Sequence, residues 1–319
     1  MNQDIIALQK QYLKYLEKNP FTGNPPKLYD SMNYILSLGG KRVRPLLVLI
    51  GSQSGKGNIE DALPLAHMIE VFHNFSLVHD DIMDHADVRR GQPTVHKKWD
   101  EPTAILSGDN LLVKTIELWR EYNGKNAFEI LDCYLKTATE VCEGQQKDMD
   151  FAMVSTPVSE IDYLEMIREK TAVLLGAALK VGFLSTNSNP EHADTFYNFA
   201  TQTGMSFQMM DDYLDSFGDG KQTGKKQGGD ILEGKNTWLK IKSHEMNDVR
   251  TRDLFSLQGQ ERIDAVVSFW KEINLDEQIR ERAQNYYNKS MSDLDQIRKW
   301  GYDTTLLASL SEWLLGRTN

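Results

Sequence analysis

The stretch "DALPLAHMIEVFHNFSLVHDDIMD" (residues 61–84) decides the fold. Its apolar residues recur at a spacing nearer to 3.6 than to 2, which is the period of a helix. Similar patterns recur at 104–120, 127–147, 159–185, 194–217 and 260–284. Breaks rich in Gly, Pro and polar residues separate these segments, and none is long enough to be a domain linker. With no convincing run of alternating, β-branched residues, the chain is predicted to be all-α and to form a single domain over residues 1–319.

Composition describes an ordinary globular protein and excludes several classes of function. The 319 residues are 40% hydrophobic and 26% charged, with a formal net charge of −10. Nucleic-acid binders normally present a basic face, so this charge argues against a nucleic-acid partner. No window approaches the roughly 18 to 20 apolar residues that a membrane span requires. We therefore expect no nucleic-acid partner and no membrane span.

The cysteines and the N-terminal segment predict a cytoplasmic protein. Cys133 and Cys142 are the two cysteines of the chain, and both fall on one predicted helix, too far apart along it to form a disulfide. The first residues, "MNQDIIALQKQYLKYLEKN", form an amphipathic pattern with charged residues and not the apolar core of a secretory signal. Reduced thiols and a cytosolic location are expected.

Two stretches carry the same acidic motif on an apolar helical run. "FSLVHDDIMD" (75–84) and "FQMMDDYLD" (207–215) each contain DDxxD. Residues i and i+4 share a helical face, which pairs Asp80 with Asp84 and Asp211 with Asp215. Two carboxylates about 6 Å apart repel by roughly 3 kcal/mol at an effective dielectric near 20. A solvated acidic face would tolerate this repulsion, but the apolar flanks favour an interior cluster that needs a counter-charge.

Magnesium is the counter-charge that these residue types favour. Carboxylate oxygens suit a hard ion, and Mg²⁺ bridges carboxylates to phosphate oxygens. Arg89 and Arg90 follow the first motif and offer forked, permanently charged donors to a diphosphate. An acidic protein can therefore hold a polyanion through divalent metal.

Other common sites fail on spacing. The segment 215–226 has Phe217 at the third position of a calcium loop and Lys226 at the twelfth, where an EF-hand requires Glu. Four histidines recur every six residues and so turn around the helix instead of sharing a face, which argues against a zinc site. They are His67, His73, His79 and His85. No nucleophile triad and no nucleotide P-loop is present.

Taken together, these motifs resemble the trans-isoprenyl diphosphate synthases, the polyprenyl synthetase family that includes farnesyl and geranylgeranyl diphosphate synthases. The similarity runs from about residue 30 to 240 and includes "GGKRVRP" (39–45), "GQQKD" (144–148) and "GKKQGGDILEGKNT" (224–237). The resemblance implies that isopentenyl diphosphate binds to Lys41, Arg44, His73 and Arg90. It implies that Arg89, Lys170 and Thr171 lie at the allylic diphosphate and that Gln208 contacts substrate, with Lys170, Thr171 and Gln208 catalytic. Two further lysines, Lys225 (or its neighbour Lys226) and Lys235, would bind diphosphate. The Mg²⁺ ligands would be Asp80, Asp84, Asp211 and Asp215.

The resemblance also implies a fold and a reaction. The fold would be a bundle of about ten or more helices around a central cavity, of the isoprenoid synthase type, in a homodimer. The reaction would be ionisation of the allylic diphosphate, condensation with isopentenyl diphosphate and loss of a proton, with both acid clusters gripping one diphosphate through shared Mg²⁺. Phe75, five positions before the first motif, and its small neighbour Ser76 would limit the product to C20, or alternatively C15.

Three alternatives stay open at this stage. A class I terpene cyclase shares a metal-bound DDxxD but normally has an Asn/Ser/Glu triad as its second motif and lacks "GGKRVRP". A non-catalytic subunit of a heteromeric synthase tends to have lost aspartates, and a helical scaffold leaves the acid clusters unexplained. Taken alone, Lys170 would be a snorkelling lysine and His73 an interior histidine, so the joint arrangement carries the assignment.

Overall fold

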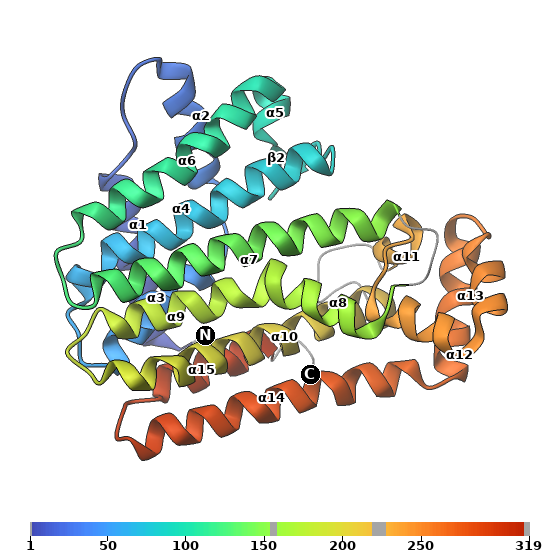
Figure 1. The fold of residues 1–319 in the computed structure, drawn as a ribbon. Coiled ribbons are helices and arrows are strands. Elements are labelled where there is room, and N and C mark those ends of the chain that lie inside the picture. Colours follow the sequence, from blue (N-terminus) through green and yellow to red (C-terminus); the bar gives the residue numbers. More distant parts are fainter. Residues whose placement is uncertain (1, 154–157, 219–227, 316–319) are drawn as a thin grey trace. The chain divides into compact units, whose positions relative to one another are not determined.

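The computed structural model describes residues 2–153, 158–218 and 228–315, and these residues are predominantly helical (Figure 1). The predicted all-α class is confirmed. The chain divides into two compact units, the first comprising Met1–Cys133 and Ala178–Ala193 and the second comprising Tyr134–Ala177 and Asp194–Asn319. The single domain stays a prediction.

The first unit is built around the helix that carries the first acidic motif. Its elements are α1 (Gln3–Lys18), α2 (Pro26–Ser37), α3 (Val43–Ser54), α4 (Ile59–Met83), β1 (Val88–Arg89), β2 (Gln92–Pro93), α5 (Val95–Lys98) and α6 (Glu101–Glu121). Helix α4 packs against both α3 and α6, and it runs alongside α6 in Figure 1. Asn58 caps its first turn, where its side chain accepts a hydrogen bond of 3.2 Å from the Glu60 amide. Most of α4 is buried, which explains why its apolar residues are not confined to one side of the helix.

The second unit carries the second acidic motif. The helices from α7 onward are α7 (Ala127–Met153), α8 (Glu160–Ile167), the π-helix η1 (Arg168–Ala172), α9 (Val173–Leu184), the 3₁₀ turn η2 (Pro190–His192), α10 (Ala193–Phe217), α11 (Gly229–Glu233), α12 (Trp238–Phe255), α13 (Gly259–Glu272), α14 (Leu275–Lys299) and α15 (Thr305–Leu315). Of these, the start of α7, the end of α9 and η2 belong to the first unit. A hydrophobic core joins the carboxyl half of α10 to α12, α13 and α14 through buried residues that include Met209, Trp238, Phe269 and Ile279. This core fixes the helix on which Asp211 and Asp215 lie.

Local structure differs from the sequence prediction in two places. The predicted segment 260–284 is two helices, α13 and α14, because Asn274 adopts a left-handed conformation with φ of 57° between them. The predicted loop after the first motif contains a two-residue hairpin in which Arg89 pairs with Gln92. Its turn residues, Arg90 and Gly91, both have positive φ (52° and 75°), as a type I′ turn requires.

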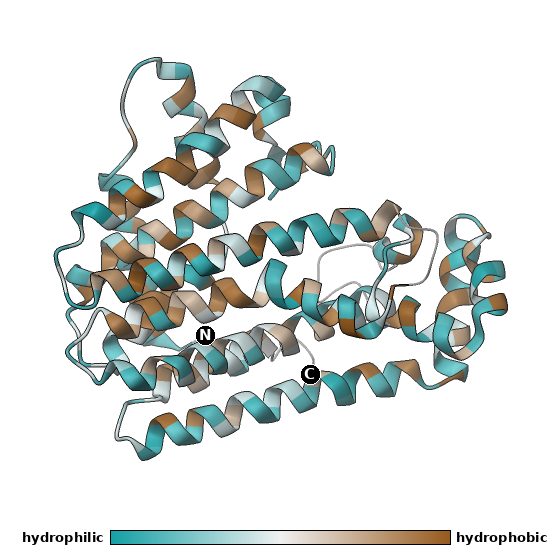
Figure 2. Cartoon of the chain, in the orientation of Figure 1, coloured by the Kyte–Doolittle hydropathy of each residue, from teal (hydrophilic) through white to brown (hydrophobic). Residues whose placement is uncertain are grey.

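Among the residues that the structure describes, no helix combines the length and the hydropathy that a membrane crossing needs. The N-terminal helix is amphipathic, as predicted, and buries Ile5, Leu8 and Tyr12. Figure 2 shows hydrophobic and hydrophilic residues alternating along α6.

Candidate active site

The first acidic motif closes the carboxyl end of α4, and its three aspartates differ in environment. Asp84 caps the helix, and its amide donates a hydrogen bond of 2.8 Å to the Asp80 carbonyl. Asp84 is exposed and Asp80 is half-buried, whereas Asp81 is only 1% exposed. Consecutive residues of a helix point about 100° apart, so the middle aspartate turns inward while the outer two share the other face. The two aspartates predicted as metal ligands are therefore not buried as a cluster.

The buried middle aspartate holds the first arginine of the hairpin. Arg89 donates to Asp81 from Nε, 2.9 and 2.8 Å from the two carboxylate oxygens, and from Nη2 at 2.7 Å. This bidentate arrangement fixes the orientation of the guanidinium plane. The side chain of Arg89 keeps 26% of its surface exposed. Asp81 thus connects the first motif to Arg89, although it was not among the residues predicted from the sequence to form the site.

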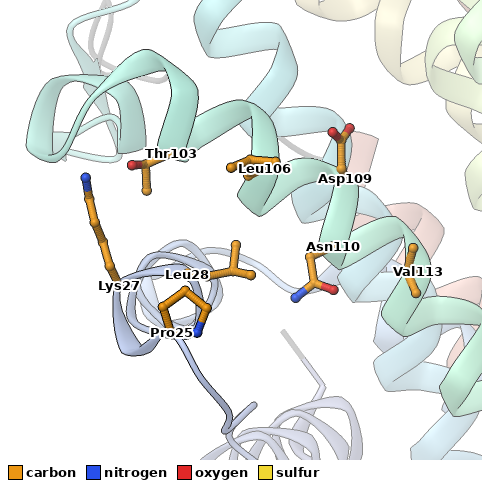
Figure 3. Close-up of a pocket in the computed structure, with 8 residues that line it drawn as sticks. All are labelled: Pro25, Lys27, Leu28, Thr103, Leu106, Asp109, Asn110 and Val113. Atoms are coloured by element: carbon orange, nitrogen blue, oxygen red, sulfur yellow. The ribbon is translucent and has the colours of Figure 1, made fainter.

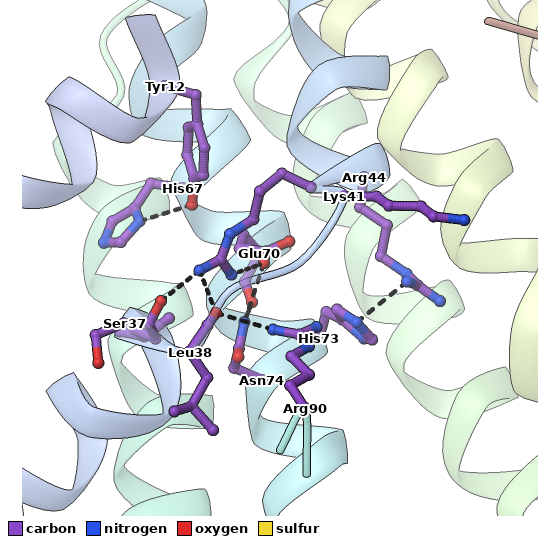
Figure 4. A network of polar contacts seen from close by, with 12 residues as sticks. Tyr12, Ser37, Leu38, Lys41, Arg44, His67, Glu70, His73, Asn74 and Arg90 are labelled. Atoms are coloured by element: carbon purple, nitrogen blue, oxygen red, sulfur yellow. Dashed lines mark hydrogen bonds and ion pairs between the residues drawn. The ribbon is translucent and has the colours of Figure 1, made fainter. Parts of the chain in front are cut away.

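The three basic residues of the "GGKRVRP" segment differ in burial: Arg42 is buried, whereas Lys41 and Arg44 are half-buried. Arg42 is buried, forms a 2.5 Å ion pair with Glu70, and donates to the carbonyls of Leu36 and Leu38 at 2.6 and 2.7 Å. In Figure 4 the side chain of Lys41 extends away from Glu70 and the rest of this network. Arg42 is therefore the anchor of the segment, and it leaves Lys41 turned outward.

Arg44 and His73 form a polar pair on the neighbouring helices α3 and α4. Arg44 Nη1 lies 3.1 Å from His73 Nε2 (Figure 4). A guanidinium can only donate, so Nε2 is the acceptor and the ring proton lies on Nδ1. Burial, followed by Arg44 and Arg90, lowers the pKa of His73 well below its usual value. Burial also lowers the pKa of Arg44 to about 10, so at neutral pH the pair has one charge, on the guanidinium.

Arg90 completes the basic group of the first unit. Its Nη1 donates to the Leu38 carbonyl at 3.1 Å, so it contacts the same loop that Arg42 anchors. Burial lowers its pKa, with Arg42 adding to the fall. Arg44 and Arg90 both act electrostatically on His73, and the role of the three residues in binding isopentenyl diphosphate stays a prediction.

The predicted chain-length residues lie one to two turns before the motif. Phe75 is 8% exposed, and its ring centroid lies 5.4 Å from that of Phe72. Ser76 is half-buried and donates to the His73 carbonyl at 2.9 Å. Phe75 is thus a packed aromatic residue, and its neighbour Ser76 has a much smaller side chain.

The second acidic motif, on α10, repeats the division of the first. Asp211 and Asp215 are half-buried, whereas Asp212 is 4% exposed. The Tyr163 hydroxyl donates to Asp212 at 2.5 Å, and Gln208 Nε2 lies 3.3 Å from the same carboxylate. Burial raises the pKa of Asp212 to about 7, against the opposing effect of these hydrogen bonds. Gln208, predicted to meet substrate, is therefore engaged with the middle aspartate through one of its amide protons.

Asp215 also organises the short helix that follows. Its side-chain oxygen accepts a hydrogen bond of 3.1 Å from the Asp230 amide, and its carbonyl accepts one of 2.7 Å from Gly228. Lys235 follows this helix and lies 3.4 Å from an Asp230 oxygen. Although burial lowers its pKa, Asp230 and Glu233 raise the pKa of Lys235 overall. Lys225 and Lys226 lie outside the described residues.

The "GQQKD" motif on α7 packs against the π-helix that carries Lys170 and Thr171. Lys170 Nζ lies 2.5 Å from Asp148 Oδ2. Gly144 permits the close approach, because a Cβ there would lie 2.4 Å from the Lys170 backbone nitrogen. Lys147 pairs with Glu169 at 2.8 Å on the same contact. Thr171 is half-buried. A π-turn at this point matches the tendency of such turns to occur at functional sites.

The donor set fits a magnesium ion that also binds phosphate. Among the described residues, no three His, Cys, Asp or Glu side chains gather into a group able to hold a metal by themselves. Each motif instead presents two carboxylates on one helical face. Mg²⁺ is usually held by one or two carboxylates plus waters and substrate phosphates, so two per motif is the expected number.

A pocket on the first unit lies away from the predicted site residues. It has a volume of about 470 Å³ and is formed by the start of α2 and by α6 (Figure 3). Its lining is mostly apolar and includes Leu28, Leu106 and Val113. None of the predicted site residues lines it.

Comparison with known proteins agrees with the fold and the motifs. The polyprenyl synthetase family model matches residues 25–273. The geranylgeranyl diphosphate synthase of Methanosarcina mazei is 36% identical over 298 residues, 92% of this chain and 90% of that protein. The short chain isoprenyl diphosphate synthase of Methanocaldococcus jannaschii is 41% identical over 240 residues, 74% of this chain and 73% of that protein. A crystal structure of a geranylgeranyl pyrophosphate synthase superposes with a TM-score of 0.90 at 37% identity and covers 99% of this chain and 98% of that one.

An all-α fold with two aspartate motifs beside sets of basic side chains defines a prenyltransferase. The chain belongs to the polyprenyl synthetase family.

Proposed function

We propose that the protein condenses isopentenyl diphosphate with an allylic diphosphate to give a short-chain all-trans prenyl diphosphate, C20 geranylgeranyl diphosphate in preference to C15 farnesyl diphosphate. The observation that carries the proposal is the division within each DDxxD motif. Asp81 and Asp212 are buried and engaged within their own units, and the outer aspartates remain on one face of each helix. A solvated acidic face does not require its buried aspartates to be held by specific partners, as Arg89 holds Asp81 and Tyr163 holds Asp212.

Magnesium is proposed as the metal, held by Asp80, Asp84, Asp211 and Asp215 together with diphosphate oxygens. When bound, Mg²⁺ supplies Lewis-acid stabilisation of the charge that develops on the leaving diphosphate. The chain's own contribution is to place the two outer carboxylates of each motif on one face of its helix. The fit of the donor set supports this assignment.

Basic residues are proposed to hold the allylic diphosphate beside the metal. Arg89 is oriented by Asp81, and Lys170 is oriented by Asp148, so each presents a fixed cation. Donors that are already oriented stabilise developing charge without reorganisation during the reaction. The same role is proposed for Thr171, Gln208, Lys235 and, outside the described residues, Lys225.

Isopentenyl diphosphate is proposed to bind Lys41, Arg44, His73 and Arg90. His73 is neutral at neutral pH, because its pKa is lowered, so it offers Nδ1–H as a donor without adding charge. Binding both substrates in one site lets the double bond intercept the allylic cation before water does. The released diphosphate is proposed to accept the final proton.

The C20 product is proposed from the residues one turn before the first motif. Helical rise puts Phe75 and Ser76 roughly 6 to 8 Å along the axis from Asp80. One packed aromatic with a small neighbour leaves room for an allylic chain beyond C15. The geranylgeranyl synthases to which the chain is similar support this length.

We also propose a homodimer that uses α6. Four large apolar side chains of this helix are more than a third exposed and fall within a stripe about 100° wide; they are Ile105, Leu106, Val113 and Ile116. Such exposed stripes mark interaction surfaces. Replacing both Leu106 and Val113 by Lys is expected to give a monomer in analytical ultracentrifugation, whereas an unchanged sedimentation coefficient would exclude this surface. The thiols Cys133 and Cys142 support a cytosolic location.

One assay tests the proposed reaction. The protein is incubated with Mg²⁺, isopentenyl diphosphate and dimethylallyl, geranyl or farnesyl diphosphate, and the products are sized. We expect a dominant C20 product that disappears in Asp80→Ala and in Asp211→Ala, while circular dichroism reports unchanged helix content. Full turnover by either variant would contradict the metal assignment, and Phe75→Ala with an unchanged product would exclude Phe75 as the limit to chain length.

A further inference from the structure

We infer that His79 is a positioning residue for product length, which holds the Phe75 ring in place from the side of α6. The inference rests on the proposed function, in which Phe75 limits the chain. It adds that the limit is a supported pair of rings and not a single aromatic side chain.

Phe75 lies between two aromatic neighbours on its own helix. Phe72 and His79 are three positions before it and four positions after it, so all three lie on one side of α4. The His79 and Phe75 ring centroids are 5.0 Å apart at an interplanar angle of 70°, an edge-to-face contact. Phe72 lies 5.4 Å from the Phe75 ring centroid, so the ring has one aromatic neighbour on the motif side, His79, and one on the other.

His79 is itself held by α6. Its Nε2 lies 3.2 Å from the Ile105 carbonyl and donates to it, since a carbonyl can only accept. The same nitrogen lies 3.7 Å from an Asp109 carboxylate oxygen. The imidazole therefore contacts one turn of α6 at two points, and its side chain is 26% exposed.

The glycine in that turn of α6 explains how the imidazole fits there. A Cβ at Gly108 would lie 2.2 Å from His79 Nε2 and 2.4 Å from Cδ2, so any larger residue would collide with the ring. Glycine in the middle of a helix is unfavourable relative to alanine. Its presence here is explained by the space that His79 needs. Gly108 thus makes room for His79, and His79 packs against Phe75.

A growing chain that meets Phe75 would consequently press against α6 through His79. Without the imidazole, the Phe75 ring gains a vacated volume on the α6 side and can turn away from the chain. Product length would then increase although Phe75 is still present. The proportion of longer product is expected to rise about two- to tenfold, the factor that loss of one aromatic contact implies.

The experiment compares product ratios, which do not depend on total turnover. Wild type, His79→Ala, His79→Phe and Asp109→Asn are incubated with Mg²⁺, isopentenyl diphosphate and farnesyl diphosphate, and the products are resolved by length. His79→Ala is expected to raise the fraction longer than the wild-type product. His79→Phe, which keeps a ring edge but no hydrogen bond, is expected to stay nearer to wild type. Asp109→Asn weakens the longer of the two α6 contacts and leaves the hydrogen bond to the Ile105 carbonyl in place, so it is expected to shift the ratio less than His79→Ala.

Two further variants separate the possible failures. Gly108→Ala displaces the imidazole without touching Phe75 and is expected to shift the ratio in a chain that still folds, because only a side-chain tip must move. If Phe75→Ala lengthens the product while His79→Ala and Gly108→Ala do not, the inference about His79 is overturned and the limit at Phe75 stands. If Phe75→Ala itself has no effect, the proposed limit fails first.

Discussion

Replacing Gly144 by Ala tests whether the "GQQKD" motif exists to bring α7 against the π-helix. The new Cβ would lie 2.4 Å from the Lys170 nitrogen and 2.8 Å from the Glu169 carbonyl carbon. Both are backbone atoms, so a side-chain rotation gives no relief, and the helices must separate by about 1 Å to reach ordinary contact. The Lys170–Asp148 contact, now 2.5 Å, would then lengthen beyond hydrogen-bond range.

The sign of the stability change distinguishes this account from helix propensity. Propensity alone favours Ala over Gly by up to about 1 kcal/mol in a helix interior. Overpacking typically costs about 1–3 kcal/mol, so after the gain in propensity we expect a net loss of up to about 2 kcal/mol in the free energy of unfolding. Urea denaturation followed by circular dichroism measures this loss.

The neighbouring exposed residue provides a matched control. Glu143→Ala changes the same turn of α7 without a packed contact and is expected to stay within about 0.5 kcal/mol of wild type. Gly144→Ala should also raise the KM for the allylic diphosphate, because Lys170 loses its fixed position. A variant that is more stable than wild type with an unchanged KM would refute the close-approach reasoning.

Three further predictions concern charges. Asp81→Asn leaves the guanidinium of Arg89 without its carboxylate and should lower the free energy of unfolding by about 2 kcal/mol. This loss is smaller than that for a fully buried ion pair because Arg89 is partly exposed. Urea denaturation measures the change, and an unchanged midpoint would contradict the prediction. Burial lowers the pKa of His67 to about 4, so the folded state resists its protonation. The free energy of unfolding should be at its full value above about pH 6.5 and fall by about 3 kcal/mol as the pH drops toward 4. The His67→Leu variant should lack this fall when it is titrated in the same way. Lys170→Met and Asp148→Asn should be coupled by about 0.2–1 kcal/mol in a double-mutant cycle on stability, since both side chains are partly exposed. Strict additivity would exclude the pair.

Much of the site could be predicted from the sequence because its residues occur in local motifs. The spacing of DDxxD on a helical run places Asp80 with Asp84 and Asp211 with Asp215, and the structure has both runs as helices. The burial of the middle aspartates follows from the same helical geometry, yet sequence reasoning did not use it. The partner of Asp81 was not predictable, because a two-residue hairpin brings Arg89 back onto the helix end.

Other features depend on tertiary contacts that no local pattern encodes. "KRVR" contains three basic residues, and nothing in their spacing indicates that Arg42 is the one buried against Glu70. The π-turn at Lys170 forms against α7, so it follows from packing and not from propensity. Asn274, which divides the last predicted helix, is a residue that tolerates the left-handed conformation and could have been read as a break.

The central claim is that binding of the allylic diphosphate requires both acidic motifs through magnesium. Calorimetric titration of a non-cleavable allylic thiolodiphosphate tests it in wild type, in Asp80→Asn/Asp84→Asn and in Asp211→Asn/Asp215→Asn, each with and without Mg²⁺. The account predicts binding that depends on Mg²⁺ in wild type and is weakened at least about tenfold by either double substitution. Wild-type affinity in either double variant, or equal affinity without Mg²⁺, would contradict it.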